Sequence, residues 1–368
     1  MIPISKPNLD EKEKEAVAAV LNSGIIASGP KVKEFEADFA KYTGVKHAIA
    51  VSNGTCSLHT CLVMNNIGKG DKVITSPFTF IASGNSIIHA GAEPVFTDVK
   101  EDSFNLDPDK IEAELKKDWF KKIKAIMVVH IYGQVCEMDR ILAIAKKYNV
   151  KVIEDAAQAV GAKFKGQLAG TFADGGSFSL YATKNITTSE GGMVTTNDDK
   201  AAEIARSFIN HGSEKIYYHT RLGYNYRMTD IEAAIGIVQL KKLDSFNDKR
   251  RKNSMELTSH LLKFPWIAAP IEGKDNFHIY HQYTIRVKNG KRDEVVKMLS
   301  EEGVGAKVFY PIPLHLQPYY KEVMKKTPSL PVSEKAALEV ISLPVHPGLT
   351  DAEKSIIRTA FDKINGRI

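Results

Sequence analysis

Residues 177–192 read SFSLYATKNITTSEGG, and this stretch decides how the chain is interpreted. Lys184 lies here among small and hydroxyl side chains, whereas lysine is normally found at solvated positions. A lysine removed from water has a lowered pKa and can act as a nucleophilic amine. The same pattern also fits a buried lysine held in an ion pair, so this motif alone leaves both interpretations open.

Two further motifs stand at the carboxyl ends of predicted strands. In VSNGTC at 51–56, small residues follow an apolar run and precede a helix-compatible stretch, so the N–H groups of a helix start could attract a phosphate. In VIEDAAQ at 152–158, Asp155 ends a buried run, where open parallel sheets bind their ligands. Without a ligand, the first motif is an ordinary strand-to-helix turn, and Asp155 could equally cap a helix.

Short β-branched runs alternate with helical segments between about residues 30 and 240, which predicts an α/β fold with strands joined by crossover helices in a mostly parallel sheet. Two helices are predicted over 31–42, behind Pro30, and from Thr229 to Leu243, behind a Thr229-x-x-Glu232 capping box. The predicted strands cover 47–51, 72–75, 93–96, 125–130, 150–153, 176–180 and 192–196.

The composition changes after Asp244, where charged helical segments alternate with extended runs. We therefore predict a large domain over 1–244 and a smaller α/β domain over 245–368. The segments on which this division rests are helical near 248–262, 293–302 and 333–340, and extended at 283–287 and 307–310.

Composition excludes several classes of function. The 368 residues are 43% hydrophobic and 26% charged, as in soluble globular proteins. The net charge is 50 − 44 = +6, with bases and acids interspersed, so neither a nucleic-acid nor a membrane partner is expected. The N-terminus shows no signal-peptide pattern, and Cys56, Cys61 and Cys136 fit reduced thiols of a cytoplasmic protein. His278-x-x-His281 precedes a predicted strand, so we interpret both as structural and expect no metal.

A phosphate cradle, a strand-end carboxylate and a lysine are together the three handles expected of a pyridoxal phosphate site. These three groups follow one another along the chain in the order cradle, carboxylate and lysine. With this order, the chain resembles the DegT/StrS family of nucleotide-sugar aminotransferases, which have the fold of aspartate aminotransferase (fold type I). The resemblance covers nearly the whole chain and rests on GPKVKEFE (29–36), VSNGT (51–55), SPFTFIAS (76–83), EDAAQAVGA (154–162), SFSLYATKNITTSEGGM (177–193), GYNYRMTDIEAA (223–234), YPIPLHLQP (310–318) and SLPVHP (342–347).

The resemblance implies a role for each motif residue toward pyridoxal 5′-phosphate. Lys184 would bind the cofactor covalently and transfer the proton, and Asp155 would hold the pyridinium nitrogen protonated. Gln158 would lie beside the ring hydroxyl, and Phe80 would stack on the ring. The phosphate would be bound by Gly54, Thr55, Cys56 and Ser179, joined by the partner subunit's Asn225, so that the site requires a homodimer.

The reaction implied by the resemblance moves an amino group from L-glutamate to a keto group, at C3 or C4, of a nucleotide-linked hexose. The segments near the active site in this family suggest substrate contacts from Lys6, Tyr181, Arg227, Tyr310 and His315, with Arg221 as a further cation for the diphosphate. The sequence departs from the common family pattern at Tyr181, Ser189 and Cys56, where histidine, glycine and alanine are frequent.

Three alternatives stay open beside this interpretation. A keto-cyclitol aminotransferase would keep the cofactor and change the substrate. A deoxysugar dehydratase of the same family would change the chemistry, although the branch that dehydrates has a histidine where this chain retains Lys184. A regulatory or scaffold protein with this fold would be expected to lose the lysine or its carboxylate partner, and both are present.

Overall fold

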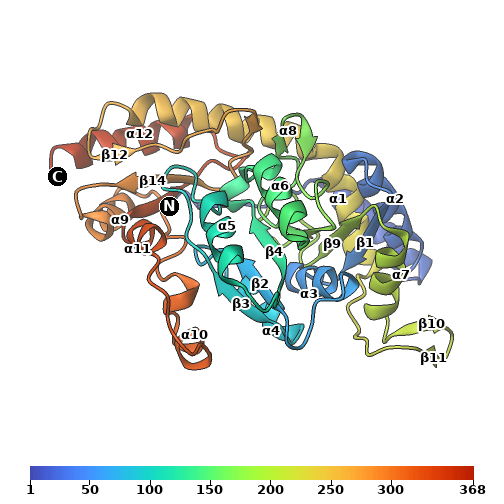
Figure 1. Cartoon of the computed structure of the whole chain (residues 1–368). Helices are drawn as coiled ribbons and strands as arrows, with labels where there is room; N and C mark the ends of the chain where they lie inside the picture. Colours follow the sequence, from blue (N-terminus) through green and yellow to red (C-terminus); the bar gives the residue numbers. More distant parts are fainter.

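The computed structural model describes the whole chain, residues 1–368. At its centre lies a seven-stranded sheet (Figure 1). Only β9 runs in the direction opposite to the other six strands, and all seven predicted strands are confirmed to within two residues at either end. In spatial order the strands are β1 (His47–Val51), β9 (Gly192–Thr196), β8 (Gly175–Ser179), β5 (Lys151–Asp155), β4 (Ile123–Val129), β2 (Lys72–Thr75) and β3 (Glu93–Phe96).

Both faces of this sheet are covered by helices. Alternate residues of each strand point to opposite sides, and apolar side chains on both sides have to be buried. Ile126 and Val128 of β4 belong to one core, and Ala125 and Met127 belong to the other. The first core is closed by α2 (Pro30–Thr43), α5 (Pro108–Lys117), α6 (Met138–Tyr148) and α8 (Asp230–Leu261). The second is closed by α3 (Gly54–Met64), α4 (Ala82–His89) and α7 (Asp199–Phe208).

The C-terminal part has a core of its own, formed around a three-stranded sheet. Ile2 joins this core, and its backbone N–H donates to Gly303 O at 2.7 Å. The helices and strands of this part are β12 (Ile267–Ala268), β14 (Tyr283–Val287), α9 (Arg292–Glu301), α10 (Pro318–Val323), α11 (Pro331–Glu339), β15 (Val340–Leu343) and α12 (Asp351–Asn365).

The predicted helices over 229–243 and 248–262 are in fact one helix, α8, of 32 residues. The charged residues between them contain no glycine or proline, so the change in composition marks a change of solvated face and not a break in the backbone. The predicted capping box of Thr229 and Glu232 is confirmed. The division at residue 245 stays a prediction, and residues 307–310 form only an isolated bridge, from Lys307 to Ser342, instead of the predicted strand.

The remaining elements are short. The helix α1 (Glu11–Ser23) packs along α8, and a hairpin of β10 (Ser213–Lys215) and β11 (Tyr218–His219) stands away from the body (Figure 1). No helix combines the length and the apolar character that crossing a bilayer requires. A small sheet is formed by β6 (Lys163–Phe164), β7 (Gln167–Leu168) and β13 (Asn276–Phe277), and the 3-10 turns are η1 (Ile131–Gly133) and η2 (Leu314–Leu316).

Candidate active site

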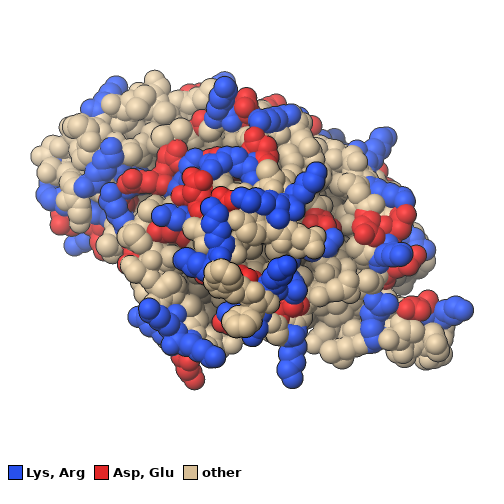
Figure 2. Space-filling view, viewed as in Figure 1, with Lys and Arg blue, Asp and Glu red and all other residues tan.

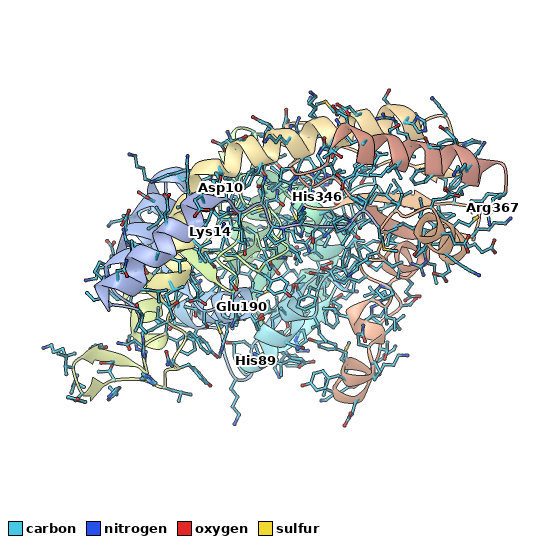
Figure 3. The ribbon with its side chains drawn as sticks, turned by 180° about the vertical axis from the view of Figure 1, so that it is seen from behind. Asp10, Lys14, His89, Glu190, His346 and Arg367 are labelled. Atoms are coloured by element: carbon cyan, nitrogen blue, oxygen red, sulfur yellow. The ribbon has the colours of Figure 1, made fainter.

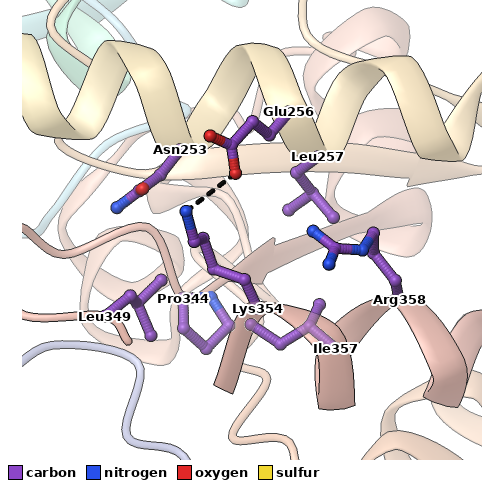
Figure 4. A pocket seen from close by; sticks show the side chains of 8 residues that line it. All are labelled: Asn253, Glu256, Leu257, Pro344, Leu349, Lys354, Ile357 and Arg358. Atoms are coloured by element: carbon purple, nitrogen blue, oxygen red, sulfur yellow. Dashed lines mark hydrogen bonds and ion pairs between the residues drawn. The ribbon is translucent and has the colours of Figure 1, made fainter. Parts of the chain in front are cut away.

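A cavity of about 710 Å³ opens at the carboxyl ends of β5 and β8 and at the start of α3. Ligands of open α/β sheets bind at this edge. A second hollow, between α8 and α12, has a volume of only about 10 Å³ and is crossed by an ion pair of 2.8 Å between Lys354 and Glu256 (Figure 4). That space is sufficient for about one water molecule. The large cavity is the candidate site because Asp155 and Lys184 both line it.

The first turn of α3 forms one wall of the cavity. Asn53 caps the helix by accepting a hydrogen bond from Cys56 N at 2.9 Å, which leaves the N–H groups of Gly54 and Thr55 without an intrahelical acceptor. Ser179 lies directly opposite, since a Cβ added at Gly54 would come within 2.8 Å of the Ser179 Cβ. Free amides, a hydroxyl and the positive end of a helix dipole together make an anion site.

Asp155 ends β5 and points into the same cavity. Ser83 Oγ donates to its Oδ2 at 2.7 Å, and Ala157 N donates to its Oδ1 at 3.1 Å. Burial raises the pKa of this carboxyl, and the hydrogen bonds and the Lys184 charge act in the opposite direction. No helix follows Asp155, so the alternative that it caps one is wrong.

Lys184 reaches the cavity from a loop that begins after β8. Its backbone N–H donates to Tyr181 O at 2.9 Å, and Leu180 closes the loop through bonds with Gly191 and Thr188. Burial lowers the pKa of the Lys184 amine to about 8, and the charge of Asp155 opposes this shift. The neutral, nucleophilic form of this amine is therefore more populated near neutral pH than that of an exposed lysine.

A polar and aromatic wall faces these groups. Tyr132 N donates to Gln158 Oε1 at 2.8 Å, which orients the amide so that its Nε2 donates to Tyr310 Oη at 3.1 Å. The ring of Phe80 is 57% exposed and lies at the mouth of the cavity, with its centroid 6.3 Å from that of Tyr310. A planar ligand could therefore lie between a ring face and hydrogen-bonding groups.

His281 also lines the cavity, although the sequence indicated only a structural role. Asn247 Nδ2 donates to the Val160 carbonyl at 3.1 Å, so its Oδ1 must accept from Asn185 Nδ2, at 2.7 Å. Asn185 Oδ1 is then the acceptor for His281 Nδ1, at 3.1 Å. This chain of bonds leaves the His281 Nε2 as a hydrogen-bond acceptor, and burial keeps the pKa of the ring well below its ordinary value.

Five predicted site residues, one of which is Arg221, do not line the cavity of the single chain. Lys6 is exposed, and Arg227 donates to Asn210 Oδ1 at 2.6 Å. Asn225 is exposed and pairs with Asn210 in an isolated bridge next to the β10–β11 hairpin. His315 is fully buried and bonds Glu334 at 3.1 Å, which places it away from the cavity.

The other predicted residues all line the cavity: Gly54, Thr55, Cys56, Phe80, Asp155, Gln158, Ser179, Tyr181, Lys184 and Tyr310. The sequence interpretation missed several residues that join them, of which Figure 3 labels two, His89 and Glu190, from segments about 100 residues apart. The remaining missed residues include Ile4, Ser5, Ser83, Tyr226, His281 and Lys307. Ser83, Glu190 and Tyr226 stand within the quoted motifs, so the motifs could have pointed to them, whereas only the fold brings the others to the cavity.

These groups fit pyridoxal phosphate. The free amides of α3 and Ser179 suit a phosphate, Asp155 suits a protonated ring nitrogen, and the Lys184 amine suits an aldehyde. The close approach of Gly54 to Ser179 leaves no room for a side chain in the cradle. The arrangement therefore has the donor set, the charges and the shape that this cofactor requires.

Comparison with known proteins agrees with this geometry. Two curated relatives are a "Pleiotropic regulatory protein" of Geobacillus stearothermophilus, 42% identical over 92% of this chain and 90% of the relative, and a GDP-perosamine synthase of Caulobacter vibrioides, 40% identical over 99% and 98%. The solved PLP form of Streptococcus pneumoniae Spr1654 superposes with a TM-score of 0.91 at 30% identity, covering 100% of this chain and 99% of the other. The model of the DegT/DnrJ/EryC1/StrS aminotransferase family matches residues 7–361, and the chain therefore belongs to that family.

Proposed function

We propose that the protein is a pyridoxal phosphate-dependent aminotransferase that moves the amino group of L-glutamate to a keto group, at C3 or C4, of a nucleotide-linked hexose. The observation that carries the proposal is the cavity that holds Lys184, with its lowered pKa, together with buried Asp155 and the α3 cradle. Family membership, the GDP-perosamine synthase relative and the neighbour solved in its PLP form support it.

Each group of the site has a separate task in this reaction. The bound cofactor would supply an electron sink for the carbon that loses its proton. The Lys184 amine would take that proton and return it to a carbon of the cofactor, because it can exist in both protonation states near neutral pH. Asp155 would hold a positive charge on the ring nitrogen, and Gln158 and Tyr310 would orient the ring from the side.

The sugar nucleotide would enter through the mouth of the cavity. Lys307 lies on this rim without an ion-pair partner and presents a cation that could meet the diphosphate. Tyr181, 46% exposed, lies three residues before Lys184 and is available to contact the hexose. We assign substrate contact to these two and Tyr310, whereas buried His315 would reach a substrate only after a rearrangement.

We further propose that the active unit is a homodimer in the cytoplasm. The β10–β11 hairpin and the segment after it expose Ile216, Tyr217, Tyr218 and Leu222, more apolar surface than a free arm of this size would be expected to keep. Asn225 follows in the same arm. Burial of this arm against a second copy would bring the partner subunit's Asn225 toward the phosphate cradle, and the three free cysteines suit a reducing compartment.

The visible absorption spectrum of the protein supplied with pyridoxal phosphate tests the proposal. We expect a yellow band that bleaches when L-glutamate is added, with release of 2-oxoglutarate, and no such response in Lys184→Ala. Lys249→Ala, an exposed position of α8 outside both the cavity and the arm, is a control for non-specific damage. A protein that forms no such band would contradict the proposal and favour a regulatory role. A Lys184→Ala variant that still releases 2-oxoglutarate would contradict the role assigned to Lys184.

The acceptor is tested separately, since glutamate reports only the first half-reaction. The glutamate-treated protein is mixed with nucleotide-linked 3-keto and 4-keto hexoses and with a keto-cyclitol, and return of the yellow band is followed. We expect recovery with a nucleotide-linked hexose. Recovery with the keto-cyclitol alone would mean that the protein is an aminotransferase but that its acceptor is not a nucleotide-linked hexose.

A further inference from the structure

The turn between α5 and β4 presents two aromatic side chains to solvent. Trp119 and Phe120 are 89% and 86% exposed. They are the two central residues of a β-turn, because Lys121 N donates to Asp118 O at 3.1 Å. The Asp118 carboxylate also accepts a bond from Ile123 N at 2.6 Å, and Lys72 N of β2 donates to Lys122 O at 2.7 Å. The turn is therefore fixed to the sheet, with its aromatic tip pointing outward.

Lysines surround this tip. The segment 116–124, KKDWFKKIK, contains five lysines and one acid, all five lysines are exposed, and its net charge is 5 − 1 = +4. Lys116 and Lys117 form ion pairs within α5, to Glu112 at 3.3 Å and Glu114 at 3.0 Å, whereas Lys121, Lys122 and Lys124 have none. Figure 2 shows Lys and Arg side chains gathered over the face that carries α5 and α6, with acids between them. We call residues 116–124 the aromatic turn.

We propose that the aromatic turn docks the protein on an anionic lipid surface. Tryptophan and phenylalanine are suited to the boundary between headgroups and acyl chains. Lysines beside them are attracted to anionic headgroups and can extend their stems along an apolar surface. The proposal differs from the sequence expectation of no membrane partner, and it needs no spanning helix because the turn would lie at the surface.

Two other occupants suit the aromatic turn less well. In a symmetric contact between two copies the same patch meets itself, which would bring two +4 segments together. Single-stranded nucleic acid is bound in grooves that follow its backbone, whereas this tip protrudes. The segment also contains no arginine, the residue that recognises phosphates in two-point geometry.

Docking through this turn would leave the candidate active site open. Ile123 begins β4, and Asp155 ends the parallel neighbour β5, so the turn and the cavity lie at opposite edges of the sheet. The seven residues of β4, at about 3.3 Å each, separate the edges by roughly 20 Å. The inference does not depend on the proposed enzymatic function, and its test needs no substrate.

Sedimentation with large unilamellar vesicles tests the proposal on the full chain with its cofactor. At about 0.1 M salt, we expect binding to vesicles of phosphatidylcholine and phosphatidylglycerol in a 7:3 ratio, and little binding to pure phosphatidylcholine. Trp119→Ser/Phe120→Ser and Lys121→Glu/Lys122→Glu should each weaken binding at least about tenfold. Two matched controls, Leu262→Ser/Leu338→Ser and Lys325→Glu/Lys326→Glu, remove exposed apolar or basic groups elsewhere and should bind within about twofold of the wild type.

Fluorescence gives a direct reading of insertion, because the chain has only two tryptophans. In a Trp266→Phe background the emission comes from Trp119 alone, and we expect it to shift to the blue and to be quenched by brominated lipid in the anionic vesicles. Absence of vesicle binding, or equal binding by all variants, would overturn the proposal. So would turn-dependent binding of a single-stranded oligonucleotide without vesicle binding, or a change of molecular mass by light scattering in Trp119→Ser/Phe120→Ser, which would indicate a contact between copies.

Discussion

Charged groups are normally exposed and large apolar groups are normally buried. The central sheet departs from this rule at both ends of its strands, with ionisable groups buried at one and aromatic side chains exposed at the other. At the carboxyl edge, Asp155 is buried and Lys184 is half-buried, and burial shifts both pKa values toward the neutral forms. At the amino edge, Trp119 and Phe120 stand in solvent. Buried charges and exposed aromatics both cost free energy, so each edge indicates binding, the first of a small polar cofactor and the second of an extended surface.

The largest expected effect is on the free energy of unfolding, and it compares a buried phenylalanine, Phe178, with the exposed Phe120. Phe178 of β8 is 1% exposed and packs edge-to-face on Phe39, with 5.1 Å between ring centroids. Phe178→Ala should lower the free energy of unfolding by about 3–5 kcal/mol, whereas Phe120→Ala should change it by no more than about 0.5 kcal/mol. Urea denaturation of the apo-protein, followed by circular dichroism at one protein concentration, measures both. A comparable loss in Phe120→Ala would mean that the aromatic turn supports the fold.

The second prediction concerns the buried carboxylate. Asp155→Asn keeps an oxygen for one hydrogen bond but removes the negative charge that would face the cofactor nitrogen. We expect the glutamate half-reaction to slow about 10²–10³-fold, the usual cost of losing one preorganised electrostatic partner. Ser83→Ala is the matched control, since it leaves the carboxylate charged and removes the 2.7 Å bond to it together with a 3.1 Å bond to Thr79, and it should cost about tenfold. Equal losses in stopped-flow measurements would mean that position, and not charge, is the contribution of Asp155.

The third prediction concerns the pH at which the amine of Lys184 becomes reactive. An amine reacts as its neutral form, so labelling of Lys184 in the apo-protein by an acylating reagent should rise with a midpoint near pH 8, instead of near about 10.4 for an exposed lysine. Asp155 stabilises the charged form, so Asp155→Asn should move the midpoint to lower pH. A blocked free lysine labelled in the same solution provides the control. Mass spectrometry after timed labelling follows both amines, and equal midpoints would show that Lys184 is solvated.

The smallest expected effect concerns backbone strain at both edges. Ser189 has φ 79° and Lys121 has φ 49°, in the left-handed region that glycine adopts without cost. Ser189→Gly and Lys121→Gly should each raise the free energy of unfolding by about 0.5–1 kcal/mol. Denaturant midpoints measure the gain, and a loss at Ser189 would indicate that its side chain makes a contact worth more than the strain.

Much of the site could be predicted because its signals are local. Lys184, Gly54 and Asp155 each follow a strand or begin a helix, and the alternation of strands and helices sets the edge at which they meet. Parallel strands have their carboxyl ends at one edge, so three distant motifs converge without any knowledge of side-chain packing.

The residues that support these groups could not be predicted in the same way. Ser83 bonds a carboxylate 72 positions away, and the orientation of His281 depends on Asn185 and Asn247. His315 has the family motif around it and yet is buried against Glu334. A motif reports the type of a residue, whereas burial and hydrogen-bond direction depend on neighbours that are remote in sequence.

The sequence by itself determined the α/β sheet, its strand boundaries and the three motifs of the cofactor site, because β-branched runs, helical periodicity and strand ends are properties of short segments. Only the tertiary structure decided that α8 is one continuous helix, that His281 presents an acceptor to the cavity, and that Trp119 and Phe120 remain in water. Exposure and proton position follow from what packs around a side chain, and this is decided when distant segments come together.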